Sequence, residues 1–185
     1  MKRSPRPPTG PAGSFLGIYL NDHLTGANAG VALLRRAARA HRGGPFGASL
    51  VSLAEDVAQD RASLRALMDA LGVPVLRTRA VAGRIAERAG LLKFNGRLLS
   101  RSPLSDVMEL EAMLVGVEGK AACWRSLRSL AGTDPRLDVA LLDELIRRAE
   151  RQARTLEALR SACAVQLFTR EAPDRTAARH SPALG

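Results

Sequence analysis

The sequence predicts an all-α protein, a four-helix bundle with one long connection between its second and third helices. Three observations favour this fold. Only 3% of the 185 residues are aromatic, whereas alanine, leucine and arginine are abundant, a composition that suits close-packed helices better than a β-sandwich. Apolar residues recur at helical spacing along four long segments. Clusters of glycine and proline separate these segments.

The chain is predicted to form one domain with two tails. Residues 1–13 are rich in proline, glycine and basic residues and are expected to be a disordered arm. The helical bundle spans residues 14–167, with a crossover at 73–102, and residues 168–185 form a disordered tail. No apolar stretch precedes Phe15 to act as a signal peptide, and no segment reads as a membrane span. We therefore expect a cytoplasmic protein.

The first helix is predicted from Phe15 to His41, where two glycines and a proline follow. On a helical wheel of about 100° per residue, His23 falls near the centre of the core face and Asn21 on the wet face. Gly26 and Gly30 share the core face, and because glycine is unfavourable in helices, we expect close approach of another helix or room beside His23. We interpret this segment as a helix-packing surface that contains one hydrogen-bonded histidine in the core.

The second helix is predicted from Ala48 to Leu71. Its wheel places Asp60 about 40° from the centre of the apolar stripe, so a carboxylate is directed at the core. Because the first loop is short, the first two helices should pack antiparallel. That pairing brings Asp60 to nearly the height of His23.

The crossover at 73–102 is the most basic part of the chain. Its seven basic residues and one acid, Glu87, give a net charge of +6. We expect a short amphipathic helix over 76–89 and a hairpin or tight turn at Asn95-Gly96. A polyanion such as nucleic acid is the predicted partner of this surface, through Arg77, Arg79, Arg84, Arg88, Lys93, Arg97 and Arg101.

The third helix is predicted from Pro103, after an N-cap at Ser102, to about Leu130. Glu111 and Glu118, one heptad apart, are expected on its core face. Lys120 is expected on the wetter side. A second apolar strip has two explanations, cover by the 73–102 connection or a homodimer interface; it consists of Leu110, Met113, Val117 and Trp124.

The fourth helix is expected to start at Pro135 after an N-cap at Asp134 and to end before Thr169. Gln152 lies in its inner stripe. Two helix orders are open: if the middle helices run parallel, Glu118 reaches the height of Asp60 and His23, and if the helices alternate up and down, Glu111 does.

Four polar residues are the candidate site, His23, Asp60, Glu111 and Glu118. They are interpreted as a hydrogen-bonded network that fixes helix register, joined by Tyr19, Arg148 or Gln152, because buried carboxylates need such partners. The alternative is an incomplete site for one divalent ion, iron, manganese or zinc, since imidazole and carboxylates suit several such ions.

The helix count and the long crossover between helices two and three resemble the ferritin-like superfamily over residues 14–167. Di-iron members bind metal through two glutamates and two Glu-x-x-His pairs. No Glu-x-x-His occurs in this chain, so the resemblance implies the architecture without a standard di-iron centre. The stretch from Tyr19 to Leu24 also looks like the start of uncharacterised bacterial helical-bundle proteins.

The predicted function is a structural or protein-interaction role without catalysis. No nucleophile constellation, phosphate-binding glycine loop or zinc spacing occurs in the sequence, and Cys123 and Cys163 are expected to be reduced core thiols. Two alternatives remain open: a degenerate ferritin-like protein that binds a divalent metal, and a polyanion-binding protein that uses the basic crossover.

Overall fold

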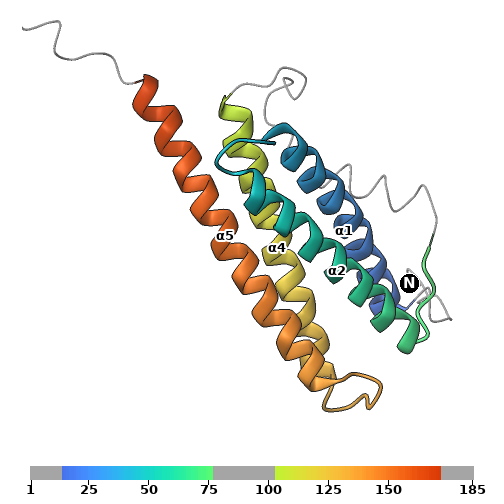
Figure 1. Cartoon of the computed structure of the whole chain (residues 1–185). Helices are drawn as coiled ribbons and strands as arrows, with labels where there is room; N and C mark the ends of the chain where they lie inside the picture. The colour runs from blue at the N-terminus through green and yellow to red at the C-terminus, as the bar shows by residue number, and fades with distance from the viewer. Residues whose placement is uncertain (1–13, 77–102, 172–185) are drawn as a thin grey trace, which may run out of the picture.

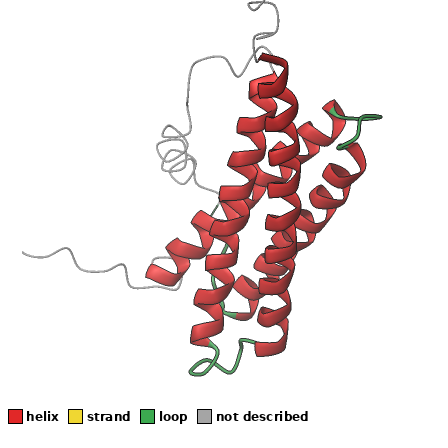
Figure 2. Cartoon of the chain, turned by 90° about the vertical axis from the view of Figure 1, so that its left-hand side faces the viewer, coloured by secondary structure: helices red, strands yellow, loops and turns green. Residues whose placement is uncertain are grey.

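Four helices make up most of the computed structural model, which describes residues 14–76 and 103–171 (Figure 1). The helices are α1 (Phe15–Ala40), α2 (Gly47–Ala70), α4 (Pro103–Leu130) and α5 (Val139–Glu171). The described residues contain no strand (Figure 2). The prediction of an all-α, four-helix fold is confirmed. The predicted basic arm at 1–13, and the polyanion-binding residues, short helix and hairpin expected between 77 and 102, lie outside the described residues.

Local hydrogen bonds explain where the helices begin. Ser14 caps α1, since the amide N–H of Gly17 donates to its Oγ at 3.0 Å. Asp138 caps α5, because its Oδ1 accepts the N–H of Ala140 at 2.8 Å. The predicted cap Asp134 was wrong, as its carboxylate instead holds the side chain of Arg136. The predicted end of the last helix was also too early, because α5 continues to Glu171.

Contacts at the two ends of the bundle establish the helix order. Arg136, in the α4–α5 turn, donates from Nη1 to the carbonyl oxygen of Leu71 at 3.1 Å, so α2 ends where α4 ends. His41 Nε2 lies 3.4 Å from Asp106 Oδ1, so α1 ends where α4 begins. The helices α2 and α4 are therefore parallel, so α2 ends and α4 begins at opposite ends of the bundle (Figure 1). Of the two helix orders open from sequence, the parallel one is confirmed.

The hydrophobic core runs along the whole bundle and receives side chains from all four helices. On α4 these residues recur every three or four positions, which is the spacing of one helical face. The strip predicted to be covered by the crossover or to form a dimer interface is this core face. The structure therefore corrects its placement: the strip packs inside the single chain, where its members are buried, Leu110, Met113, Val117 and Trp124.

The predicted core face of α1 is rotated from the observed one by about one residue, or 100°. On α1 the core centres on Leu20, Leu24 and Val31, and His23 is only half-buried. Nor do Gly26 and Gly30 reflect close approach of a described helix, because a Cβ at either position would meet no atom of the described residues within 4 Å. Leu16 and Tyr19 of the predicted face also pack against the core, which explains why that face could be mistaken for its centre.

Asn21, predicted to face water, is 3% exposed and ties α1 to the chain that follows α2. Its Nδ2 donates to the carbonyl oxygens of Gly17 at 2.8 Å and Pro74 at 3.1 Å. Its Oδ1 accepts the backbone N–H of Leu76 at 2.7 Å. One buried amide thus satisfies polar backbone groups where the chain leaves α2, which is the usual condition for burying such a side chain.

Candidate functional site

A buried polar cluster joins α2, α4 and α5 at mid-bundle, centred on Asp60. This residue is 1% exposed. Its Oδ2 accepts hydrogen bonds from Lys120 Nζ at 2.5 Å and Gln152 Nε2 at 2.9 Å. Its Oδ1 accepts one from Arg148 Nε at 2.6 Å. Lys120 also donates to Gln152 Oε1, so the four side chains form one connected network.

The electrostatics of the cluster are set by one buried anion and two cations. Burial lowers the pKa of Lys120 below its ordinary value, and the attraction of Asp60 opposes that shift without reversing it. Arg148 lowers the pKa of Lys120 further, by repulsion. Desolvation of the ammonium and repulsion by Arg148 therefore together outweigh the attraction of Asp60, as expected for charges removed from water.

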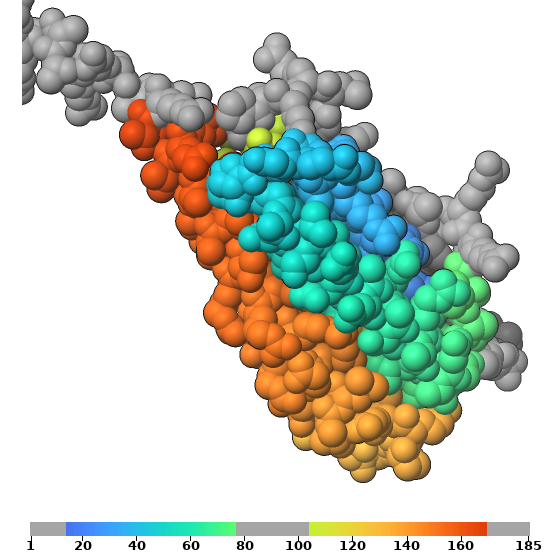
Figure 3. Space-filling view, viewed as in Figure 1, coloured from blue at the N-terminus to red at the C-terminus, as the bar shows by residue number. Residues whose placement is uncertain are grey.

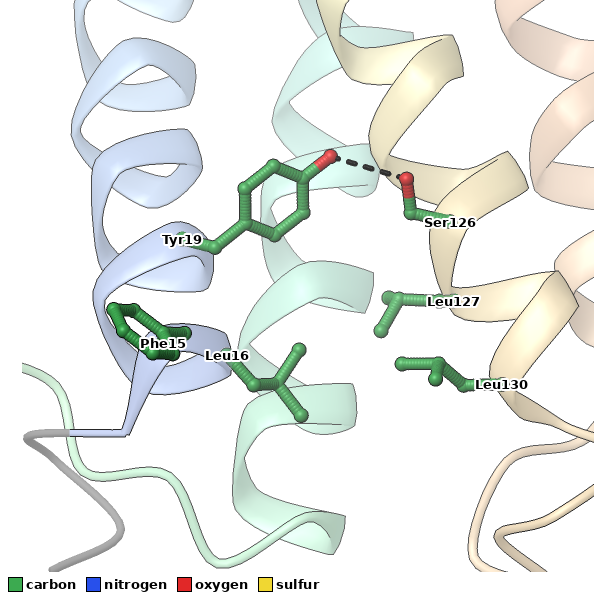
Figure 4. A pocket seen from close by; sticks show the side chains of 6 residues that line it. All are labelled: Phe15, Leu16, Tyr19, Ser126, Leu127 and Leu130. Carbon is green, nitrogen blue, oxygen red and sulfur yellow. Dashed lines mark hydrogen bonds between the residues drawn. The ribbon is translucent and has the colours of Figure 1, made fainter. Parts of the chain in front are cut away.

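Among the predicted partners, Arg148 and Gln152 do join Asp60, whereas His23 and Tyr19 lie elsewhere. The rings of Tyr19 and His23 pack edge to face, with centroids 4.5 Å apart. The hydroxyl of Tyr19 donates to Ser126 Oγ at 3.3 Å (Figure 4). His23 thus belongs to the seam between α1 and α4, and the Asp60 cluster is built by the other three helices.

Glu111 and Glu118 do not reach the cluster, because both are exposed. Glu111 faces Arg160 of α5, with Oε1 and Nη1 3.8 Å apart. Each follows the buried face of α4 by one residue, since the residues before them, Leu110 and Val117, are buried. The expected metal ligands are therefore not brought together. Within 14–76 and 103–171, no three His, Cys, Asp or Glu side chains are grouped so as to hold a metal ion.

Lys120 belongs to the cluster, although it was predicted on the wetter side of its helix. A signal for it exists in the spacing. Lys120 lies three residues after Val117 and four before Trp124, so it occupies a regular position in the buried row of α4. A single lysine in such a row, opposite an inward aspartate on another helix, indicates a buried ion pair.

Cys123 is the second buried ionisable group on α4, and we expect it to make stability fall at alkaline pH. Burial raises the pKa of its thiol to about 12, from an ordinary value of 9.0. Above pH 9 the unfolded chain loses this proton and the folded chain keeps it, so the stability present below pH 9 is lost as the pH rises towards 12. Between pH 9 and 10 the loss should be about 1 kcal/mol.

Urea denaturation of the wild type and Cys123→Ala at pH 8, 9 and 10 measures this contribution. The titration of Lys120 and Cys163 is common to both proteins and cancels in the comparison. The wild type should lose about 1 kcal/mol more than the variant between pH 9 and 10. Parallel stability curves would contradict the shielding of this thiol.

None of the described helices is both long and apolar enough to cross a membrane. Neither a protein-family model, nor a curated protein, nor a solved structure matches the chain. The function is accordingly inferred from the chemistry of the cluster. That chemistry consists of a carboxylate that accepts hydrogen bonds from an ammonium, a guanidinium and an amide.

Proposed function

We propose that this chain is a non-catalytic helical-bundle protein with a structural or protein-interaction role. In this proposal the Asp60 cluster fixes how α2, α4 and α5 fit together. One observation carries it: both oxygens of the buried Asp60 are engaged by side chains of the protein itself, from Lys120, Arg148 and Gln152.

A saturated carboxylate is poorly suited to catalysis or to metal binding. A general acid or base must be within hydrogen-bond reach of its substrate, and a metal ligand needs a lone pair to give. Two surface pockets lie elsewhere. One, of about 360 Å³, is formed by α1 and α4 around Phe15 and Leu130 (Figure 4). The other, of about 400 Å³, lies at the α1–α2 turn. Neither is lined by a member of the cluster.

The cluster can select one rotation of α4 against α2 and α5, which the apolar surfaces alone do not. Apolar side chains occur nearly all round α4, so apolar contact alone would tolerate more than one rotation of that helix. Only one rotation lets Lys120 meet both Asp60 and Gln152. Buried ion pairs add little stability over an apolar core, but a misplaced one is penalised heavily. Selection of one arrangement is therefore the role that the energetics support.

The helix order supports a ferritin-like arrangement within this proposal. The parallel α2 and α4, joined by a long crossover, match that topology. Di-iron members place carboxylate and histidine ligands in the bundle core, and the core of this chain carries an ion pair with an amide at mid-bundle. We infer a bundle whose core polar groups bind one another through salt bridges instead of binding a metal ion.

Replacing Lys120 tests the structural role through the sign of its effect. In the wild type, Lys120→Met should lower the free energy of unfolding by about 1 kcal/mol, because Asp60 and Gln152 lose a donor. In an Asp60→Ala background the same change should raise it by about 1 kcal/mol, because it removes a buried cation that has lost its anion. Urea denaturation of the four proteins gives the coupling energy.

Additive effects in that cycle would mean that the two side chains do not act together. They would remove the basis of the proposed role. Arg65→Met is the matched control, since Arg65 is an exposed cation of α2. It should change stability little, and equally, in both backgrounds.

A further inference from the structure

The C-terminal end of α1 carries a concentration of arginines that the fold does not neutralise. Four arginines and no acid occur between residues 35 and 42. Arg36 pairs with Glu109, with Nη2 and Oε1 2.6 Å apart. Arg35, Arg39 and Arg42 are exposed and make no ion pair with any residue the structure describes.

Three exposed or partly exposed arginines of α5 show the opposite pattern. Glu144 holds Arg147 and Arg151, with nitrogen–oxygen distances of 3.0 and 2.8 Å, and Glu157 holds Arg160 at 2.7 Å. These pairs formed on the outer face of one helix without any ligand. Exposed arginines without an ion pair also occur singly elsewhere in the described residues, at Arg65 and Arg154, so what distinguishes α1 is that three of them lie between residues 35 and 42.

Two of these arginines, Arg39 and Arg42, line a pocket at the α1–α2 turn. The pocket has a volume of about 400 Å³. Its other lining residues are Ala38, Gly43, Gly44, Gly47, Ala48 and Val51. None of them is acidic, and most are too small to block an approaching ligand. The turn lies at an end of the described bundle, on the upper edge of the space-filling view (Figure 3).

The turn itself accounts for its glycines but not for both arginines. Gly43 has a positive φ of 78°, and a Cβ on Gly47 would lie 2.6 Å from the carbonyl oxygen of His41, so both positions need glycine. A helix C-terminus favours a cation in its last turn, which explains Arg39. Arg42 follows the end of the helix, and the backbone of the turn does not require it.

We propose that this pocket binds a phosphate group, held by the guanidinium groups of Arg39 and Arg42. Guanidinium presents several N–H donors in one plane and binds phosphate in a bidentate manner. Two such groups on one acid-free pocket supply both the charge and the donors that a phosphate oxygen cluster requires. Arg35, about one turn earlier, adds positive charge on the approach. The site is distinct from the Asp60 cluster and does not depend on the role proposed for it.

The phosphate group could belong to either of two ligands, a small phosphate compound or the backbone of a nucleic acid. The full chain is titrated with inorganic pyrophosphate by calorimetry, and with a labelled 20-base-pair DNA by fluorescence anisotropy at several salt concentrations. The test variant is Arg39→Gln with Arg42→Gln. The control is Arg65→Gln with Arg154→Gln, which removes the same charge from exposed positions on α2 and α5.

Saturable pyrophosphate binding that weakens at least about tenfold in the test variant, and by less than about twofold in the control, supports a small phosphate ligand. DNA binding alone, with a slope of log K against log salt that falls by about 1.8 for two lost phosphate contacts, supports a nucleic-acid backbone. Binding of neither probe at 50 mM salt overturns the proposal. Equal losses of affinity in the test and control variants also overturn it, because they indicate that binding depends on the net charge of the protein and not on this pocket.

Discussion

Asp60→Ala should lower the free energy of unfolding by about 3 kcal/mol, among the largest effects of any single substitution in this chain. The change leaves Lys120 and Arg148 at mid-bundle without their anion. Breaking a buried pair on one side typically costs about 3–5 kcal/mol. The lower figure applies here because the side chains of Lys120 and Arg148 are 13% and 20% exposed and can partly reach water. Urea denaturation at pH 7 measures the loss.

Two comparisons make that result specific to the cluster. Asp69→Ala removes an exposed aspartate from the same helix and should change stability by less than about 0.5 kcal/mol. Combining Asp60→Leu with Lys120→Met and Arg148→Met removes all the charges together, and should recover most of the loss because an apolar core often replaces a buried ion pair without penalty. An Asp60→Ala variant as stable as the wild type would contradict a structural role, since residues kept for function are often replaced at no cost to stability.

The sequence predicts the number of helices and several of their ends well because glycine and proline residues mark where these helices stop and start. The Gly43-Gly44-Pro45 turn and the proline at Pro103 end and start helices in both the prediction and the structure. Their effect is local, through backbone geometry and a missing N–H, so it does not depend on the partners of the helix. The start of α5 was missed because two aspartates, Asp134 and Asp138, can each cap a helix. In the structure Asp134 accepts the backbone N–H and side chain of Arg136 within the turn, and Asp138 accepts the N–H of Ala140 at the start of α5.

The candidate site was predicted only in part, for a reason of geometry. Asp60 and Gln152 were placed correctly because leucine, valine and alanine at helical spacing flank them on α2 and α5, and both are buried. His23 and Glu118 were placed wrongly by one residue. On α1, Leu16 and Tyr19 pack against the core beside its buried face, and on α4 apolar residues occur nearly all round the helix. A rotation of about 100° exchanges one residue for its neighbour, so Val117 replaced Glu118 on the core face and Leu24 replaced His23. Which face of such a helix is buried is decided by its partners, and single-sequence periodicity does not contain them.

Trp124→Ala should lower the free energy of unfolding by about 3–5 kcal/mol, as large aromatic truncations in cores do. Trp124 is 1% exposed and is the largest of the fully buried side chains in the described part of the bundle. Its loss leaves a cavity beside the α1–α4 and α4–α5 contacts. Those contacts cannot close around it without moving a helix. Thermal or urea unfolding measures the effect.

Trp124→Phe separates the effect of volume from that of hydrogen bonding. The indole Nε1 of Trp124 makes no hydrogen bond with any described residue. Phenylalanine at this position therefore leaves no polar partner unsatisfied there, and should lose only about 1–2 kcal/mol for the smaller ring. Val115→Ala, at an exposed position of the same helix, should lose less than about 0.5 kcal/mol.

If Trp124 served a subunit interface instead, Trp124→Ala would reduce the mass measured by light scattering and leave the unfolding of the monomer nearly unchanged. Burial inside one chain predicts the reverse, a large loss of stability at constant mass.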